Sequence, residues 1–239
     1  MINRDLKRIK KLVGNTFKIN EDSLFDIQSR EGIILANKEY VFKCFTLFNE
    51  QIELMKHSLK SKLLPHNLFV LHKKFIDTNQ YIIHNYLKLK ALSEAIKNKK
   101  IETVLSFEVY LIDNLIIAKM PYMDFKPYKG SKKRDMVLLL KKFLELGWIP
   151  TDLKPSNIKI KKDGESHLIF TDIGYFFVPY YEELFKTACR RAFISVFFAT
   201  TDNLNNYLRE ATHSRHFNYL ENPKKQKQVF DKFYKKIIS

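Results

Sequence analysis

Residues 148–160 have the sequence WIPTDLKPSNIKI, and this stretch decides which fold we expect. It follows the helical pattern of residues 133–147 and precedes a short predicted strand at 158–161. Four residues that form turns or carry charge come close together in it: Asp152, Lys154, Pro155 and Asn157. Such residues also occur in simple connecting loops, so the neighbouring segments have to decide between a turn and a functional site.

The composition indicates a folded protein. The chain has 239 residues, which is enough for one large domain or two small lobes. Hydrophobic residues make up 45% of it and aromatic residues 14%, so the chain can bury a core and is not intrinsically disordered.

The charge is strongly basic, with a formal net charge of +16. A field of this sign attracts nucleic acid, anionic membranes, nucleotides and acidic proteins. No recognisable nucleic-acid motif accompanies it, so we expect no nucleic-acid partner and interpret most lysines as a solvated surface. The basic segment 222–239 is either the last helix of the fold or a surface for an acidic partner or a peripheral membrane contact.

Two cysteines, Cys44 and Cys189, are too few for a disulfide framework or a zinc cluster. Both lie in apolar surroundings, which predicts buried thiols in a reducing compartment. The first residues lack the apolar core of a signal peptide, and no run approaches the roughly 18 apolar residues of a membrane span. We therefore expect a cytoplasmic protein, and delivery through a bacterial secretion machine is compatible with this sequence.

The first half of the chain predicts mostly strands. Its pattern indicates a helix at 1–13, strands within 16–46 with a hairpin turn near Asn37-Lys38, a helix at 47–64, strands within 68–86 and a short helix at 89–98. Two further strands are expected within 103–123, with Asp113-Asn114 as their turn.

The second half predicts mainly helices. The helix at 133–147 ends at Gly147, and the opening loop follows it. Then come strands at 158–161 and 167–171, a turn between them at Asp163-Gly164, and helices from about residue 180. The fold class is therefore α+β. The stretch 121–130 holds two prolines and a glycine, which divides a β-rich lobe at 1–123 from a mostly helical lobe at 124–239.

The order of these elements resembles the catalytic core of protein kinases. The family places a helix before an aspartate loop of the form D-L-K-P-x-N, then a strand pair, then D-F-G. Here these motifs are Asp152-Leu153-Lys154-Pro155-Ser156-Asn157 and Asp172-Ile173-Gly174. The resemblance implies a bilobal kinase-like fold that uses ATP and Mg²⁺. It implies that Asp152 accepts the acceptor's proton, that Lys154 offsets phosphoryl charge, and that Asn157 and Asp172 bind magnesium.

The resemblance also implies a nucleotide clamp in the first lobe. Lys43, on a predicted strand, is similar to the phosphate-binding lysine of the family. Its partner should be a glutamate on the next helix. Glu53 is the first choice, with Glu50 and then Glu94 as alternatives.

The segment LIIAKMPYMDF (115–125) is similar to the strand and hinge that hold adenine in kinases. By this resemblance Met120 guards the back of the ATP pocket. Pro121 and Met123 present backbone groups to the base. Pro121 has no N–H, so it can contribute only its carbonyl oxygen.

The sequence departs from the family in four places. It lacks the glycine-rich loop, it has Pro150-Thr151 where the family has His-Arg, it has Ile173 in place of the D-F-G phenylalanine, and it has neither a long activation segment nor an A-P-E element. A short second lobe of this kind resembles the small effector kinases that bacteria inject into host cells, and compact viral kinases. The resemblance implies constitutive activity or activation by a host partner.

The predicted function is ATP- and Mg-dependent phosphorylation of serine or threonine in a protein substrate. Lys154 favours this class over small-molecule phosphotransferases. Two alternatives stay open: a kinase-fold phosphotransferase for a non-protein acceptor, and a pseudokinase scaffold that binds a partner through its basic surface. Residues 66–102 are left without an assigned role.

Overall fold

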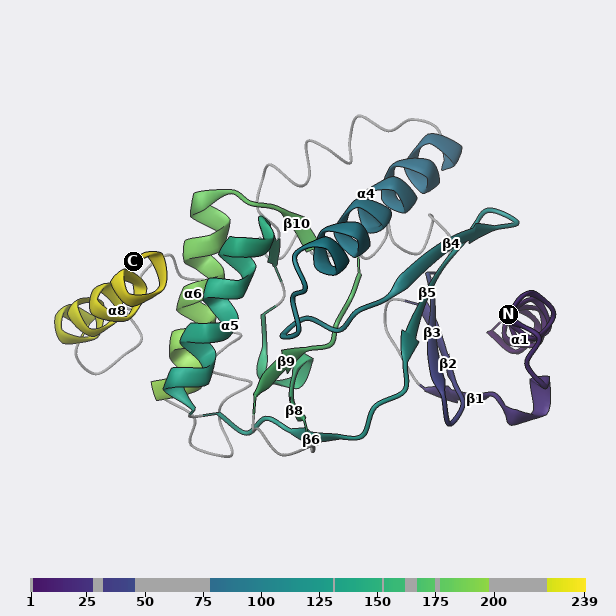
Figure 1. Cartoon of the computed structure of the whole chain (residues 1–239), viewed down its shortest axis with the longest axis horizontal. Coiled ribbons are helices and arrows are strands. Elements are labelled where there is room, and N and C mark those ends of the chain that lie inside the picture. Colours follow the sequence, from purple (N-terminus) through teal and green to yellow (C-terminus); the bar gives the residue numbers. More distant parts are fainter. Residues whose placement is uncertain are drawn as a thin grey trace. The chain divides into compact units, whose positions relative to one another are not determined.

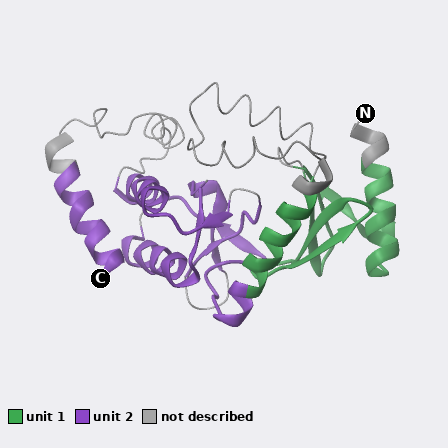
Figure 2. Cartoon of the chain, turned by 90° about the horizontal axis from the view of Figure 1, so that it is seen from above, with its two compact units in different colours: residues 1–94, 106–123 green, residues 95–105, 124–239 purple. Residues whose placement is uncertain are grey.

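The computed structural model shows that the chain folds into two compact units (Figure 2). Unit 1 comprises residues 1–94 and 106–123, and unit 2 comprises residues 95–105 and 124–239. The last passage of the chain between the units thus falls at 123–124. The structure describes residues 2–27, 32–45, 78–130, 132–151, 153–161, 167–174, 177–197 and 223–239.

Unit 1 is built on a five-stranded antiparallel sheet (Figure 1). Its strands, in spatial order, are β1 (Phe25–Ile27), β2 (Gly32–Ala36), β3 (Tyr40–Phe45), β5 (Leu115–Pro121) and β4 (Glu108–Ile112). Every pairing between neighbours is antiparallel. The prediction of an α+β fold is confirmed, and β3 lies at the centre of this sheet.

Two tight turns set the register of the sheet. Between β2 and β3, Asn37 Oδ1 accepts hydrogen bonds from the backbone N–H groups of Glu39 and Tyr40, at 2.8 and 2.7 Å. Between β4 and β5, Asp113 and Asn114 both have positive φ, 49° and 61°, as a type I′ hairpin turn requires. Both turns were predicted from the sequence, and both are confirmed.

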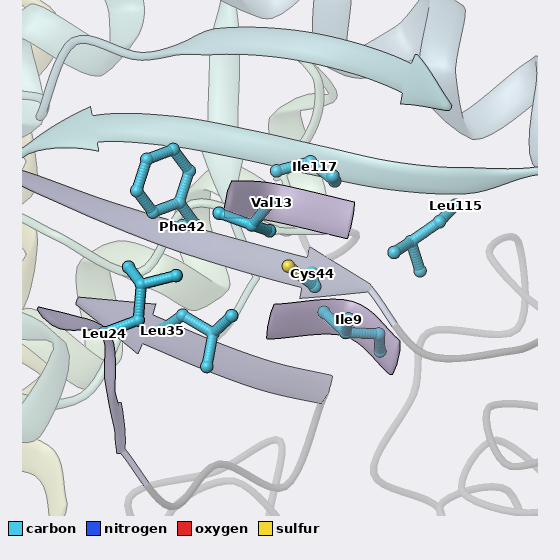
Figure 3. Close-up of a cluster of buried hydrophobic side chains, with 8 residues drawn as sticks. All are labelled: Ile9, Val13, Leu24, Leu35, Phe42, Cys44, Leu115 and Ile117. Carbon is cyan, nitrogen blue, oxygen red and sulfur yellow. The ribbon is translucent and has the colours of Figure 1, made fainter. Parts of the chain in front are cut away.

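Helix α1 (Ile2–Phe17) covers one face of the sheet (Figure 3). Its Ile9 and Val13 pack against alternate residues of three strands, which are Leu35, Phe42, Cys44, Leu115 and Ile117, and against Leu24. The Phe17 ring lies 4.9 Å, centroid to centroid, from both Phe42 and Tyr110. This face of the sheet is therefore an apolar core and leaves the opposite face for other contacts.

The strand predicted from residue 16 is wrong. Helix α1 continues to Phe17 because Ile9, Val13 and Phe17 keep helical spacing against the sheet. Lys18 then adopts a left-handed conformation, with φ 55°, and a 3₁₀ turn, η1 (Glu21–Ser23), follows. The side chain of Asn20 caps this turn by accepting a hydrogen bond from the Asp22 N–H at 3.0 Å.

The strand predicted within 81–87 is also wrong, because these residues belong to helix α4 (Thr78–Asn98). The buried positions of α4 are Ile82, Asn85, Leu89, Leu92 and Ile96, which follow a helical period over the whole element. The local alternation in YIIHNYL matched a strand by coincidence, and the helix predicted at 89–98 is only the second half of α4. The helix predicted at 47–64, the strand residues 68–77 and the turn at Asp163-Gly164 lie outside the described residues.

The described residues of unit 2 form three helices and two small sheets. The helices are α5 (Lys133–Leu146), α6 (Glu182–Phe197) and α8 (Pro223–Ile238). One sheet has the order β6 (Phe125–Pro127), β8 (Ile158–Lys161), β9 (Leu168–Phe170), and the other pairs β7 (Trp148–Pro150) with β10 (Phe177–Pro179). The predicted helix at 133–147 and the strands near 158–161 and 167–171 are confirmed. Strands β6, β7 and β10 were not predicted, since three residues are too few to show an alternating pattern.

Residues 95–105 join unit 2 through specific bonds. Lys99 Nζ donates to the backbone oxygens of Glu145 and Leu146, at 2.6 and 3.4 Å, and so caps the C-terminal end of α5. Val104 forms a parallel bridge with Phe170, beside β9. These bonds fix the stretch between α4 and β4 to α5, which precedes the D-L-K-P-S-N segment, and to β9, which precedes the D-I-G segment.

Both thiols should be unreactive in the native chain. Cys44 and Cys189 are free and buried, and burial raises the pKa of Cys44 to about 12 and the pKa of Cys189 further. Because the thiolate is the reactive form, we expect both to react with a disulfide reagent at pH 8 more than about 100-fold more slowly than a free cysteine. Titration with Ellman's reagent, with and without denaturant, checks this. Rapid reaction of one thiol in the native chain would contradict the burial of that residue.

Among the described residues, no helix combines the length and the apolar composition that crossing a membrane requires.

Candidate active site

The structure brings Asn157 and Asp172 together, although they are 15 positions apart in the sequence. Asn157 Nδ2 donates a hydrogen bond to Asp172 Oδ2 at 2.9 Å. The β8–β9 hairpin causes this contact, because Ile158 pairs with Phe170 and so places the residues flanking each strand side by side. The backbone N–H and the hydroxyl of Thr171 both donate to the Asn157 carbonyl, at 3.0 and 3.3 Å.

The loop before Asn157 alternates between buried and exposed residues. Leu153 and Pro155 are buried, whereas Lys154 and Ser156 are exposed. Pro155 opens the 3₁₀ turn η2 (Pro155–Asn157), where its fixed φ suits the first position, and the Asn157 N–H donates to the Lys154 carbonyl at 3.0 Å. The apolar residues anchor the loop, and Lys154 is presented to solvent. Asp152, the predicted base, lies outside the described residues.

The Asp172-Ile173-Gly174 motif is anchored by its central residue. Ile173 is fully buried, so isoleucine fills an apolar site at the position where kinases have phenylalanine. The Ile173 N–H donates to the Thr171 carbonyl at 3.1 Å, and the Gly174 carbonyl accepts from the Phe177 N–H at 3.2 Å. Asp172 itself is only half-buried, so its carboxylate is held by its neighbours yet keeps access to a ligand.

The oxygen atoms of Asp172 and Asn157 suit magnesium. Mg²⁺ prefers hard oxygen ligands and is usually held by one or two side chains together with substrate phosphates and water. The described part of the chain contains no group of three or more His, Cys, Asp or Glu residues that could enclose a metal ion. A carboxylate and an amide oxygen would suit Mg²⁺ bound with phosphates better than zinc, which takes nitrogen and sulfur ligands. In the structure the Asn157 amide presents its nitrogen to the Asp172 carboxylate.

Lys43 lies at the centre of the sheet face that α1 does not cover. It pairs with Ile34 on β2 and with Ala118 on β5, and directly paired residues point to the same face. Its side chain is only 4% exposed, and its ammonium lies 5.5 Å from the centre of the Phe45 ring. The neighbouring Phe42 and Cys44 point to the opposite face, into the α1 core.

Met120 shares this face with Lys43, because it pairs with Val41, two residues before Lys43 on β3. Met120 is buried, whereas Pro121, which ends β5, is exposed. The Tyr122 N–H donates to the Glu39 carbonyl at 2.7 Å. Because Pro121 has no N–H and the Tyr122 N–H is already bonded, Met123 is the next residue after β5 whose backbone a ligand would meet.

Two exposed apolar residues on β1 were not predicted as site residues from the sequence. Phe25 pairs with Ala36 on β2, and Ala36 pairs in turn with Val41 on β3. Ile27 pairs with Ile34, which is the β2 partner of Lys43. Phe25 and Ile27 therefore lie on the Lys43 face, and they remain 47% and 42% exposed. A large exposed ring on an edge strand carries no distinguishing sequence pattern, so only the register reveals that it belongs to this face.

The predicted site residues thus fall into two groups, one in each unit. Lys43, Met120, Pro121 and Met123 belong to unit 1, and Lys154, Asn157 and Asp172 belong to unit 2. Among the candidate partners of Lys43, Glu50 and Glu53 lie outside the described residues, and Glu94 is exposed on α4.

Comparison with known proteins adds no assignment. The sequence matches no protein-family model. A search of curated proteins also returns no match.

Proposed function

We propose that this chain is a magnesium-dependent kinase that transfers the γ-phosphoryl group of ATP to serine or threonine hydroxyls of a protein. The observation that carries the proposal is the contact between Asn157 and Asp172. Two motifs that resemble the catalytic motifs of kinases meet at 2.9 Å through the residues that the resemblance assigns to metal binding.

Asp172 and Asn157 would hold the magnesium ion through the Asp172 carboxylate and the Asn157 Oδ1 atom. When bound, Mg²⁺ would supply positive charge that offsets the charge of the nucleotide phosphates. The chain's own contribution is to fix both ligands in advance: Thr171 holds the Asn157 backbone, and buried Ile173 holds the Asp172 backbone. With both backbones fixed in this way, only the two side chains would have to adjust when the nucleotide binds.

Lys43 supplies a positive charge for the nucleotide phosphates. Its ammonium is buried, and in a buried setting the attraction between an ammonium and a phosphate is stronger than in water. The position of Lys43 on the third strand of the sheet is also the position of the phosphate-binding lysine in kinases.

The nucleotide base would lie against the row formed by Phe25, Ala36, Val41 and Met120. Ala36 and Ala118, which lie on this face, have small side chains that would take up little of the space a planar ring needs. Phe25 is the exposed aromatic residue at one end of this row, where it can cover the base. The carbonyl of Pro121 and the backbone of Met123 then meet the polar edge of the base.

The transfer step requires an acceptor hydroxyl held in line with the phosphoryl group. Asp152 would orient that hydroxyl and accept its proton, as the D-L-K-P-x-N resemblance implies. Lys154 is exposed two positions further on, where a protein segment and its phosphoryl group can both reach it. This lysine supports a protein acceptor over a small molecule.

The proposal is tested by incubating the purified chain with γ-labelled ATP, Mg²⁺ and a generic protein substrate. We expect label on serine or threonine, and none when EDTA removes the metal. Lys43→Met should lower kcat/KM for ATP by about 100-fold or more, because one phosphate-binding charge is lost. Lys119→Met is the matched control: Lys119 lies on the neighbouring strand but pairs with Phe42, on the opposite face, over the Tyr40 ring.

Three outcomes would contradict the proposal. Absence of transfer together with absence of a Mg-ATP-dependent rise in Tm would favour a scaffold. Label only on a small molecule or a lipid would exclude a protein acceptor. Equal losses in Lys43→Met and Lys119→Met would show that charge or stability, and not phosphate contact at Lys43, accounts for the effect.

A further inference from the structure

Arg191 joins helix α6 to the first residue of the loop 151–157. Its Nη1 atom donates a hydrogen bond to the backbone oxygen of Thr151, 40 positions earlier in the sequence. Thr151 directly follows β7 and precedes Asp152. The family has a His-Arg pair immediately before the aspartate, whereas this chain has Pro150-Thr151, so here an arginine reaches the same backbone from a distant helix.

The helix that carries Arg191 is firmly packed. Arg191 lies in the middle of α6, between turns whose inward residues, Ala188, Cys189, Ala192 and Phe193, are buried. The Phe193 ring packs against Phe230 and Phe233 of α8, at 5.6 and 5.7 Å between centroids. These contacts hold the backbone that carries the guanidinium, and the bond of the guanidinium to a carbonyl is charge-assisted, about twice as strong as a neutral hydrogen bond.

The bonded oxygen belongs to the peptide group that joins Thr151 to Asp152. A peptide group is planar, so a hydrogen bond to its oxygen restricts rotation of the whole group. Further along the loop, buried Leu153 and Pro155 and the two bonds from Thr171 to Asn157 restrict the backbone. Pro150 has no N–H that could anchor the start of the loop, and Arg191 provides an anchor there.

We propose that Arg191 is a positioning residue, which holds the start of the loop 151–157 so that its functional side chains keep their orientation. This role rests on the proposed kinase function. In this role Arg191 acts through the backbone of Thr151 and not on a reacting atom. Loss of such an anchor should slow the chemical step and leave the binding of nucleotide to the other unit's residues unchanged.

The test compares Arg191→Met, Arg191→Lys and Arg190→Met. Arg190 is the adjacent residue of α6, and its guanidinium lies 5.8 Å from the centre of the Phe230 ring, so it is a control with the same change of charge and length. We expect Arg191→Met to lower kcat about 100-fold with KM for ATP unchanged. Arg191→Lys keeps one cationic donor and should recover part of kcat, and Arg190→Met should stay near the wild type.

A second measurement does not depend on catalysis. Amide hydrogen exchange of residues 153–158 should accelerate about tenfold or more in Arg191→Met and stay at the wild-type rate in Arg190→Met. If the wild type transfers no label, the proposed function fails and the exchange rates alone decide on the anchor. Unchanged exchange in Arg191→Met, or an unchanged kcat in an active enzyme, would overturn the role of Arg191. Equal acceleration in both variants would also overturn it, since it would show general loosening of α6.

Discussion

Asp172→Ala should lower the rate of phosphoryl transfer at least about 1,000-fold while the chain stays folded. The substitution removes the only carboxylate that the proposed magnesium site has among the described residues, and a single amide oxygen from Asn157 does not hold the ion. The cost to stability should stay within about 0.5–1.5 kcal/mol, the usual worth of one hydrogen bond such as that from Asn157 Nδ2. Single-turnover transfer from labelled ATP and the melting temperature are the two measurements.

The substitution Asp172→Asn distinguishes the role of the negative charge of Asp172 from the role of its hydrogen bond with Asn157. An asparagine keeps the size of the side chain and an oxygen that can accept the bond from Asn157 Nδ2, but it loses the negative charge. If the carboxylate acts by holding magnesium, Asp172→Asn should lose nearly as much activity as Asp172→Ala, and a higher Mg²⁺ concentration should restore part of it.

The matched control is Asp135→Ala, which removes the same charge from the first turn of α5. Asp135 forms a partly exposed ion pair with Lys132 at 3.5 Å, and exposed pairs of this kind contribute little to stability. Transfer should stay near the wild type in this variant. Activity within tenfold of the wild type in Asp172→Ala would contradict the assignment of Asp172 as a metal ligand.

The sequence predicts the site best where chemistry requires particular residue types at fixed spacing. The D-L-K-P-S-N and D-I-G segments stand at either side of the β8–β9 hairpin, so the contact of Asn157 with Asp172 follows once the hairpin is predicted. Lys43 was predicted on a strand, and the register adds that Met120 and Phe25 share its face. Such an alignment depends on which strands pair, and pairing partners far apart in the chain leave no local pattern.

The errors have the same physical origin. YIIHNYL alternates like a strand over seven residues, yet Ile82, Leu89 and Leu92 are buried at helical spacing and belong to helix α4. The anchoring by Arg191 was also missed, because a bond across 40 residues depends on the packing of α6 and not on any neighbouring motif. Local patterns therefore predict elements and chemistry, whereas tertiary packing decides which competing pattern prevails.

Phe143→Ala should have the largest effect on stability. The Phe143 ring is fully buried on α5 and lies 5.7 Å from Phe170 and 6.0 Å from Phe177, which are themselves 5.4 Å apart, centroid to centroid. The three rings join a helix to β9 and β10, the strands before and after Asp172. Deleting a buried phenylalanine from such a cluster costs about 3–5 kcal/mol through lost burial and the cavity left behind.

Trp148, the only tryptophan, lies on β7 in unit 2, so its fluorescence during urea unfolding reports on the unit that contains Phe143. Leu138→Ala, on the same helix but at a side chain that is 43% exposed, should change the free energy of unfolding by less than about 0.5 kcal/mol. Phe143→Leu keeps most of the volume and should cost about 1–2 kcal/mol. Because Phe170 precedes Thr171 and Asp172 directly, this folded variant should also transfer phosphate more slowly. If Phe143→Ala and Leu138→Ala changed the free energy of unfolding and the transfer rate equally, the aromatic cluster would not support the Asp172 loop.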